Sequence, residues 1–266
     1  MCSAESLDRV FFQIGSIPIY WYGVIIATGV FLGFYIATKE SNRLGLEKDL
    51  MTDLLVFALP IAVIFARLYY VVFEWEQYAD GPWWKVFAIL GAVLTAIVFA
   101  RVKKVSFWQI ADIAAPALIL GQAIGRWGNF MNQEAYGGPI SASTYERFHQ
   151  YLPDFIMNNM CINGVMHHPT FLYESVWNIL VLILLLVLRR KNPVRGEVFL
   201  TYLITYSIGR FFIEGLRLDS LYVFGLRTAQ FVSIALIIGS LILIIYRRFS
   251  GTVQHRYNGD AYKPKK

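Results

Sequence analysis

Long apolar runs separated by short polar stretches dominate this chain. Seven such runs can be traced, at about residues 19–38, 52–73, 84–100, 110–130, 170–190, 198–215 and 227–246. A helix of roughly 20 mostly apolar residues is long enough to cross about 30 Å of hydrocarbon. The pattern therefore predicts an all-α integral membrane protein with about seven transmembrane helices. The chain shows no internal repeat, so we expect residues 1–266 to form a single transmembrane domain.

The composition supports this class of protein. Hydrophobic residues make up 57% of the 266 positions and charged residues only 16%, whereas a soluble domain carries about 25% charged residues. The net charge of +6 could indicate binding to nucleic acid. The basic residues, however, lie in short clusters at the ends of the apolar runs, which is the distribution that membrane topology produces. We therefore expect membrane lipids, and no nucleic acid, among the partners.

The basic clusters also predict the orientation. Sixteen of the 24 Lys and Arg residues follow the first, third, fifth and seventh runs, and the segments on the other side hold few. Because Lys and Arg are enriched in cytoplasmic loops, the N-terminus is expected outside and the C-terminus in the cytoplasm. The longest segment between runs, residues 131–169, then lies outside. Long segments often form lids or binding loops, so we expect a small extracytoplasmic cap there, between spans four and five.

Charged side chains inside the apolar runs are the strongest indication of function. Each costs about 2.5–3.5 kcal/mol to insert, so such residues usually mark a functional site or a buried ion pair. The candidates are Arg67, Arg126, Glu174, Arg210 and Glu214. With the predicted orientation, all of them lie towards the outer leaflet. We expect these five side chains to cluster around one cavity there, open sideways to lipid.

The spacing of these residues suggests what they bind. Arg210, Glu214 and Arg217 share one helical face, and so do Arg126 and Asn129. A guanidinium can grip a phosphate through two hydrogen bonds at once. The nearby Gly125 and Gly128 allow a ligand or another backbone to approach closely. Together these features favour an anionic phospholipid headgroup.

Each residue also has a simple structural explanation. Arg210 and Glu214 could form an intrahelical ion pair, and Arg67 could extend to the membrane surface. Glu174 could favour the N-terminus of its helix. Tyr22 could be an interfacial aromatic residue, and His168 an ordinary loop residue. No single one of these explanations predicts that the residues converge at one depth, and the convergence favours a functional site.

Four short motifs and a single arginine carry a resemblance to a known family. Residues 125–134 read GRWGNFMNQE, which closely resembles the signature GRxGNFxNxE of bacterial prolipoprotein diacylglyceryl transferases. Trp21-Tyr22-Gly23 and Arg67 are similar to motifs of the family's first and second spans. Residues 168–174, HPTFLYE, resemble its HPxxLYE motif. Arg210 to Glu214, with Arg217, resemble its RxxxE segment.

The resemblance implies a transferase at the outer face of the bacterial inner membrane. It would move the diacylglyceryl group of phosphatidylglycerol to the lipobox cysteine thiol of a preprolipoprotein, releasing glycerol 1-phosphate, without a metal or cofactor. The catalytic residues that it implies are Tyr22, Arg126, Asn129, Glu134 and Arg210. The substrate-binding residues are Arg67, Gly125, Gly128, His168, Glu174, Glu214 and Arg217.

The residues suit this reaction. Arg126 and Arg210 can stabilise the leaving phosphate. Tyr22 and Asn129 can donate hydrogen bonds to the headgroup, and the three glutamates can orient the arginines.

One departure from the family pattern stands before the third run. The family usually carries a Gly-rich segment with a histidine, of the type GGxxxHGG, whereas residues 83–92 here read WWKVFAILGA. This resembles an internal loss of about ten residues, and it leaves open a catalytically impaired, lipid-binding member of the family. A transporter of an anionic solute would also use intramembrane arginines, typically near the membrane midplane and within internal repeats.

Overall fold

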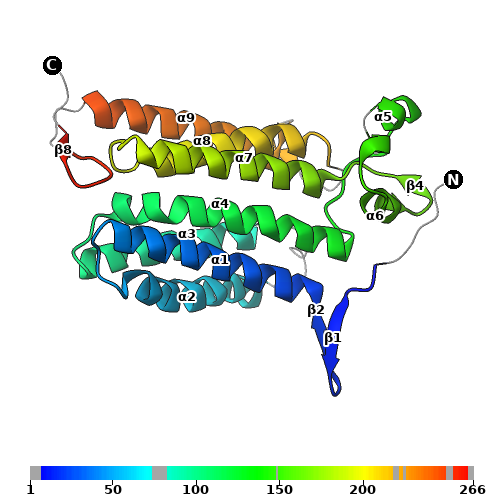
Figure 1. Cartoon of the computed structure of the whole chain (residues 1–266), viewed down its shortest axis with the longest axis horizontal. Coiled ribbons are helices and arrows are strands. Elements are labelled where there is room, and N and C mark those ends of the chain that lie inside the picture. The colour runs from blue at the N-terminus through cyan, green and yellow to red at the C-terminus, as the bar shows by residue number, and fades with distance from the viewer. Residues whose placement is uncertain are drawn as a thin grey trace.

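Seven long helices lie side by side in a computed structural model that describes residues 7–73, 83–147, 149–217, 222–223, 226–249 and 254–262. Figure 1 shows them in one bundle with a roughly common axis. They are α1 (Trp21–Arg43), α2 (Leu50–Phe73), α3 (Trp83–Val102), α4 (Phe107–Asn132), α7 (Thr170–Arg190), α8 (Glu197–Glu214) and α9 (Thr228–Phe249). Each coincides with one of the predicted apolar runs, so the prediction of a mainly helical protein is confirmed.

Four of these helices, α1, α4, α7 and α9, are long and apolar enough to cross a membrane. Shorter apolar stretches occur in α2 at Leu50–Ile61 and in α3 at Val93–Val102. Helix α8 has only 18 residues and includes three charged ones, Glu197, Arg210 and Glu214, which lower its hydropathy. An integral membrane protein is therefore supported, and the count of seven spans stays a prediction.

Within the described residues, four two-stranded antiparallel hairpins correct the prediction of an all-helical chain. They are β1 (Val10–Ile14) with β2 (Ile17–Tyr20), β3 (Cys161–Ile162) with β4 (Val165–Met166), β5 (Tyr222–Val223) with β6 (Leu226–Arg227), and β7 (Gln254–His255) with β8 (Ala261–Tyr262). The turn between β3 and β4 is Asn163-Gly164, and both residues have positive φ. Asn-Gly is a strong hairpin signal, because the two-residue turn needs positive φ at both positions. The sequence thus held a hairpin signal that the search for apolar runs overlooked.

The two ends of the bundle differ, and we name them by what lies there. At the loop end, α1 begins and α4 ends, and the segment between α4 and α7 folds beyond the helices (Figure 1). This segment contains α5 (Ala142–Arg147), η1 (His149–Tyr151), α6 (Asp154–Met157), η2 (Asn158–Met160) and the β3–β4 hairpin. Its Ile156 and Met160 pack with Phe130 of α4 and Phe171 of α7. The next residue, Cys161, is buried and disulfide-bonded.

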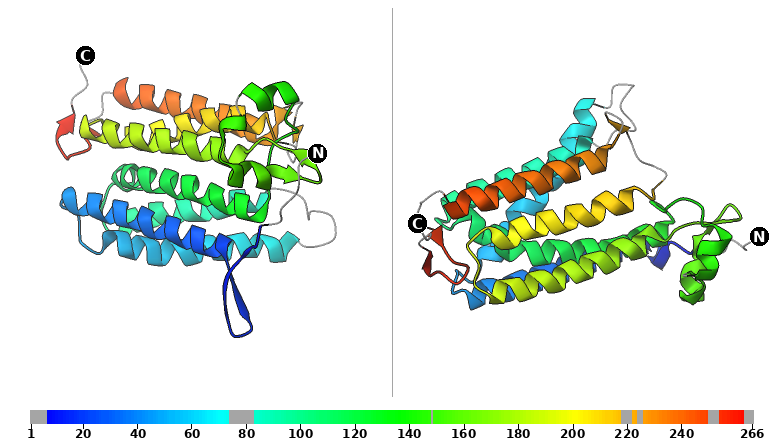
Figure 2. Two further views of the ribbon diagram at one scale, coloured as in Figure 1. Left: turned by 45° about the vertical axis from the view of Figure 1, so that its right-hand side comes forward. Right: turned by 90° about the horizontal axis from the view of Figure 1, so that it is seen from above.

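The β1–β2 hairpin also lies at the loop end. It projects sideways from the bundle in both Figure 1 and the left view of Figure 2. The packing of Ile156 and Met160 against α4 and α7 shows that the segment between these two helices is folded, as expected for a cap. Its extracytoplasmic location stays a prediction.

At the tail end, the β7–β8 hairpin folds back onto the helices. Its Tyr257 is 1% exposed and packs in a cluster with Ile119 of α4 and Leu185 of α7. The Tyr257 hydroxyl donates a 2.9 Å hydrogen bond to Glu40 of α1. Glu40 also pairs with Arg43 at 2.7 Å and with Arg189 of α7 at 3.3 Å. Burial raises the pKa of the Tyr257 phenol above its usual range, so the hydroxyl stays a donor.

Small residues let α1 lie close to α4. A Cβ atom on Gly33 would stand 3.1 Å from the carbonyl oxygen of Ala117, and one on Gly29 would stand 3.5 Å from Gly121 Cα. Small residues four positions apart commonly permit such close helix contact in membranes. On its other side α4 packs against α7 and α8. It is thus the central helix, and it lies between the two groups of residues that make up the candidate site.

Candidate functional site

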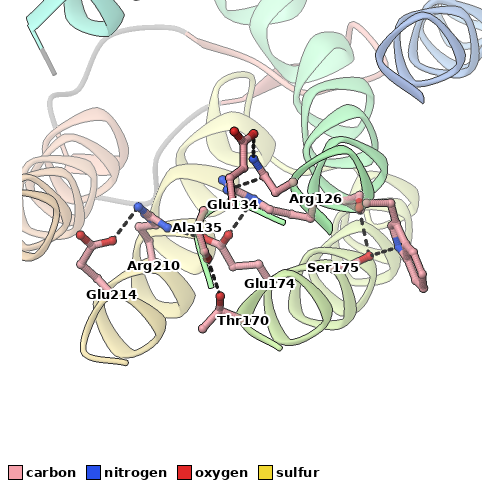
Figure 3. A network of polar contacts seen from close by, with 11 residues as sticks. Arg126, Glu134, Ala135, Thr170, Glu174, Ser175, Arg210 and Glu214 are labelled. Carbon is pink, nitrogen blue, oxygen red and sulfur yellow. Dashed lines mark hydrogen bonds and ion pairs between the residues drawn. The ribbon is translucent and has the colours of Figure 1, made fainter. Parts of the chain in front are cut away.

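A chain of ion pairs joins α4, α7 and α8 near the loop end. Glu174 binds two arginines at once: its Oε2 lies 2.6 Å from Arg126 Nε, and its Oε1 lies 2.6 Å from Arg210 Nη1. Arg210 Nη2 in turn lies 2.6 Å from Glu214 Oε2. Figure 3 shows Glu174 between the two arginines, with Glu214 beyond Arg210. The structure therefore brings together four of the five charged residues that the sequence singled out.

The helices explain this geometry. Arg210 and Glu214 are four residues apart on α8, which places them on one face, as the spacing predicted. Glu174 lies in the second turn of α7 and is only 5% exposed. A carboxylate this deeply buried needs compensating partners, and the two guanidinium groups supply them: Arg210 through a short, charge-assisted hydrogen bond and Arg126 through an ion pair.

The network continues from Arg126 to the end of α4. Arg126 Nη1 donates to Asn129 Oδ1 at 3.3 Å, and Asn129 Nδ2 donates to Glu134 Oε1 at 2.8 Å. Helix α4 ends in a left-handed residue, Gln133, with φ of 52°. The chain then turns back, and the Glu134 N–H bonds to the Asn129 carbonyl at 3.0 Å. This turn brings the exposed Glu134 carboxylate to Asn129 and explains why the motif spaces them five residues apart.

A cavity of about 630 Å³ opens beside this network, between α1, α2 and α4. Its polar wall includes Tyr22, Arg126 and Asn129, and most of the rest is apolar, contributed by residues such as Val30, Phe34 and Leu54. Gly125 also lines it. The Tyr22 ring packs directly on Gly128, where a Cβ atom would stand 2.8 Å from the ring. Any larger residue at 128 would therefore displace Tyr22.

The expectation that all five charged residues surround one cavity needs correction. Of the four whose side chains the structure describes, only Arg126 lines this cavity. Glu174, Arg210 and Glu214 lie behind Arg126, because α7 and α8 pack on the side of α4 away from α1 and α2. The side chain of Arg67 is outside the described part of the structure, so its predicted place stays untested.

His168 and Arg217 lie where the loop segment joins α7 and α8. The His168 carbonyl accepts the Gly137 N–H at 3.0 Å, and its ring Nδ1 is 3.2 Å from Tyr173 Oη. Arg217 forms an isolated antiparallel bridge with Gly137 through its backbone. Thr170 adds a 2.7 Å hydrogen bond to the Ala135 carbonyl. Through these contacts His168 and Arg217, both predicted to bind substrate, hold the segment after Glu134 in place.

Three further polar residues were not predicted: two lie near the network, and the third, Asp112, lies at the tail end of α4. Arg227 donates to the Glu214 carbonyl, and Gln122 of the cavity wall donates to Tyr202 Oη at 2.9 Å. Asp112 is completely buried in α4. As a charge inside an apolar run, Asp112 carried the same signal as Arg126 and could have been found by it. Among the described residues, no group of three or more His, Cys, Asp or Glu residues could hold a metal ion.

Comparison with known proteins identifies the family of this chain. Residues 9–246 match the family model described as prolipoprotein diacylglyceryl transferase. The chain is 69% identical to a phosphatidylglycerol–prolipoprotein diacylglyceryl transferase of Oceanobacillus iheyensis, over 96% of this chain and 92% of the relative. Proteins of the same name from Halalkalibacterium halodurans and Bacillus cereus are 54% and 55% identical; the matches cover 98% and 96% of this chain and 93% and 98% of those relatives.

The matched regions are longer in the relatives than in this chain. The Oceanobacillus match extends over 267 positions, whereas 96% of the 266 residues here amounts to only about 255. Some positions of the relative therefore have no counterpart, which agrees with an internally shortened chain. Helix α3 is nevertheless continuous from Trp83 to Val102. With a matching family model over most of its length and close relatives over nearly all of it, the chain belongs to the prolipoprotein diacylglyceryl transferase family.

Proposed function

We propose that this protein transfers the diacylglyceryl group of phosphatidylglycerol to the lipobox cysteine thiol of a preprolipoprotein signal peptide. The observation that carries the proposal is the position of Arg126. It ends a chain of buried ion pairs on one side and lines a mostly apolar cavity on the other. A phospholipid has the matching shape, with an anionic group joined to apolar tails. The cavity wall extends along α1 from Tyr22 to Ala37, about 22 Å at 1.5 Å per residue.

The contacts of Arg126 leave it able to bind an anion. Within the described residues, the Arg126 side chain donates a hydrogen bond to Asn129, and its Nε forms an ion pair with Glu174. A guanidinium carries five N–H donors, so donors remain for a phosphate at the cavity. Because Glu174 holds Nε, the guanidinium is already oriented before the lipid arrives. Such preorganised donors stabilise developing charge without a cost of reorientation during the reaction.

In the proposed reaction the lipobox sulfur attacks the glyceryl carbon that carries the phosphate. A C–S bond forms, the C–O bond to the phosphate breaks, and glycerol 1-phosphate leaves with the bonding electron pair. The thiol proton passes to a base or to the leaving group. Arg126 stabilises the departing phosphate, and Tyr22 and Asn129 donate hydrogen bonds to it from the same cavity wall. Arg210 acts through Glu174, and Glu214 holds Arg210.

The remaining predicted residues support this centre. Glu134 fixes Asn129, Gly125 keeps the cavity wall open, and Gly128 makes room for the Tyr22 ring. His168 and Arg217 position the chain after Glu134, and Arg67 is a further contact for the headgroup.

We further propose that the loop end faces outward. Arg43, Arg101, Arg189 and Arg190 lie at the tail ends of their helices, and the positive-inside rule assigns such clusters to the cytoplasm. With this orientation, the proposed protein has seven spans, an outer cap at residues 131–169 and a single transmembrane domain over residues 1–266. The site then faces the outer leaflet of the bacterial inner membrane.

Transfer of a labelled diacylglyceryl group from phosphatidylglycerol to a lipobox peptide, in detergent micelles with purified protein, tests the proposal. We expect turnover that depends on the peptide cysteine, with a Cys→Ser peptide as the control. Lipid binding without turnover would instead identify an impaired member of the family, in line with the shortened segment before α3. A protein that neither binds the lipid nor transfers the diacylglyceryl group would refute the assignment.

A further inference from the structure

A second contact joins α4 to α8 at the tail end, far from the arginines. Asp112 of α4 is 0% exposed, and its two carboxylate oxygens accept backbone N–H groups at the start of α8. Gly196 N donates to Oδ2 at 2.6 Å, and Phe199 N donates to Oδ1 at 2.9 Å. Phe199 is the third residue of α8, whose N–H an N-cap side chain normally binds, and the N–H of the N-cap residue itself is the one that a capping-box side chain binds. Gly196 is the N-cap of α8 and has no side chain, so a residue of another helix caps α8 instead.

The fit at this contact leaves little freedom. Trp108 lies one turn before Asp112 on α4, and a Cβ atom on Gly196 would stand 2.7 Å from the Trp108 ring. Gly196 also has φ of 95°, a conformation that other residues rarely adopt. The start of α8 is therefore held by hydrogen bonds and by close packing against one face of α4. A carboxylate at a helix N-terminus is also favoured by the helix dipole.

The two contacts between α4 and α8 are separated by equal lengths of helix. Asp112 precedes Arg126 by 14 residues on α4, and Gly196 precedes Arg210 by 14 residues on α8. Both helices begin at the tail end, so they run in the same direction. Fourteen residues correspond to about 21 Å and nearly four turns. The cap at one end and the shared Glu174 at the other therefore lie at matching heights on both helices. Between them, Gln122 of α4 donates to Tyr202 of α8 at 2.9 Å.

We infer that Asp112 is a positioning residue that fixes the axial register of α8 against α4 and so places Arg210 on Glu174. A slip of α8 by one residue would move Arg210 by about 1.5 Å and turn it by about 100°. The 2.6 Å ion pair of Arg210 with Glu174 of α7 could not survive such a slip, whereas the pair with Glu214 lies within α8 and would move with it. Through Glu174, the register of α8 also determines how Arg126 faces the cavity. This inference rests on the proposed function for its kinetic consequence only.

The Asp112→Asn variant tests the inference. An amide has one acceptor oxygen in place of two, and its NH₂ group would face a backbone N–H. We expect kcat for diacylglyceryl transfer to fall by about tenfold to a hundredfold, because small misplacements of catalytic groups have effects of this size. KM for phosphatidylglycerol should change much less. Glu197→Gln is the matched control: Glu197 is also buried at the start of α8, but it pairs with Arg248 of α9 at 2.6 Å. The Glu197→Gln variant should have a lower thermal stability than the wild type, with little change in kcat.

A double-mutant cycle with Arg210→Lys separates positioning from a general loss of structure. If Asp112 acts through Arg210, the Asp112→Asn change should reduce kcat far less in the Arg210→Lys background than in the wild type. An equal reduction in both backgrounds would overturn the inference. So would a variant that loses thermal stability but keeps its kcat. If Asp112→Asn fails to fold, Asp112→Glu keeps the carboxylate but lengthens the side chain, and the same cycle applies.

A measurement of the register itself does not depend on turnover. Spin labels on Leu118→Cys of α4 and Phe212→Cys of α8, both exposed positions, report the distance between the helices. We expect Asp112→Asn to shift or broaden the distance distribution and Glu197→Gln to leave it unchanged. An unchanged distribution in Asp112→Asn would overturn the inference. If the wild-type chain shows no transfer but the distribution responds as expected, the proposed function fails and the positioning role stands.

Discussion

Two buried glutamates at opposite ends of the bundle hold arginines in nearly the same way. Glu174 at the loop end and Glu40 at the tail end are 5% and 4% exposed. Each forms ion pairs with two arginines, Glu174 with Arg126 and Arg210, and Glu40 with Arg43 and Arg189. Residue type, burial and pairing do not distinguish the two sites.

What distinguishes them is the surroundings of the arginines. Arg126 lines a cavity of about 630 Å³, with Tyr22 and Asn129 beside it. At the tail end, a hairpin covers the acid, and Tyr257 supplies a third partner to Glu40. A buried ion pair is weak evidence of function by itself, because many such pairs are structural. Access to a ligand-sized cavity is the feature that assigns a function to one of the two networks.

The largest difference between the two ends should appear when an arginine is removed. Arg126→Ala should reduce the transfer rate by about a hundredfold or more, as the loss of a transition-state donor typically does. Arg126→Lys should recover little activity, because an ammonium cannot reproduce the planar fork. Arg43→Ala, at the half-exposed partner of Glu40, should leave the rate within about twofold, the difference that an assay of initial rates can resolve. Similar rates for the Arg126 and Arg43 variants would remove the distinction.

The glutamates themselves give a matched pair of variants. Glu174→Gln and Glu40→Gln each break buried ion pairs, and removing one partner of such a pair costs about 3–5 kcal/mol. For Glu40 the half-exposed Arg43 can be rehydrated, so the cost should be smaller. Both should lower the thermal midpoint in detergent by several degrees, but only Glu174→Gln should reduce the activity of the protein that stays folded. A fully active Glu174→Gln protein would contradict the proposed role of Glu174 in orienting the arginines.

Smaller effects are expected from the two tyrosines. Tyr22→Phe removes a hydroxyl at the cavity, and a lost hydrogen bond of about 1 kcal/mol corresponds to a roughly fivefold slower transfer with stability unchanged. Tyr257→Phe removes the 2.9 Å hydrogen bond to Glu40 and should lower stability by a similar free energy with activity unchanged. Rates of transfer and thermal midpoints for both variants, measured side by side, test this reversal. The idea fails if Tyr257→Phe slows transfer while Tyr22→Phe does not.

The smallest effect concerns stability at high pH. Burial raises the pKa of the Tyr257 phenol above its ordinary value of 10.0, so the folded protein holds this proton more tightly than the unfolded chain. The stabilisation is fully present below about pH 10 and declines as the pH rises above that value. Above pH 10 the thermal midpoint of the wild type should therefore fall more steeply than that of Tyr257→Phe. Lys103, whose pKa a hydrogen bond to Asp53 raises, contributes equally to both proteins and cancels in the comparison.

Much of the helical framework could be predicted from the sequence. Every predicted apolar run became a helix of 18 residues or more. In lipid the backbone has no water to bind, and a helix satisfies its backbone hydrogen bonds within the segment. The spacing of Arg210 and Glu214 correctly placed them on one helical face, since that relation depends on a single helix. The four short hairpins were missed because their signals are local turn residues, such as Asn163-Gly164, outside the apolar runs.

The division of the charged residues between cavity and interior could not be predicted in this way. Helical periodicity gives the face of each residue within its own helix, but not the neighbour that covers that face. Arg126 and Arg210 carry the same signal in the sequence, and only the packing of α1 and α2 on one side of α4 separates them. The partners of Glu40 and Asp112 could not be predicted for a related reason: Tyr257 and Gly196 are 217 and 84 residues away along the chain.

The amino-acid sequence is enough to identify a helical membrane protein of a particular transferase family, with charged residues in its apolar segments. The length of the apolar runs, the distribution of charges and the spacing of the motifs depend only on the order of residues along the chain. The tertiary structure decided which acid holds which arginine, which arginine lines the cavity, and which end of the bundle the tail closes. Those outcomes depend on contacts between helices far apart in the chain, and only the packed bundle specifies them.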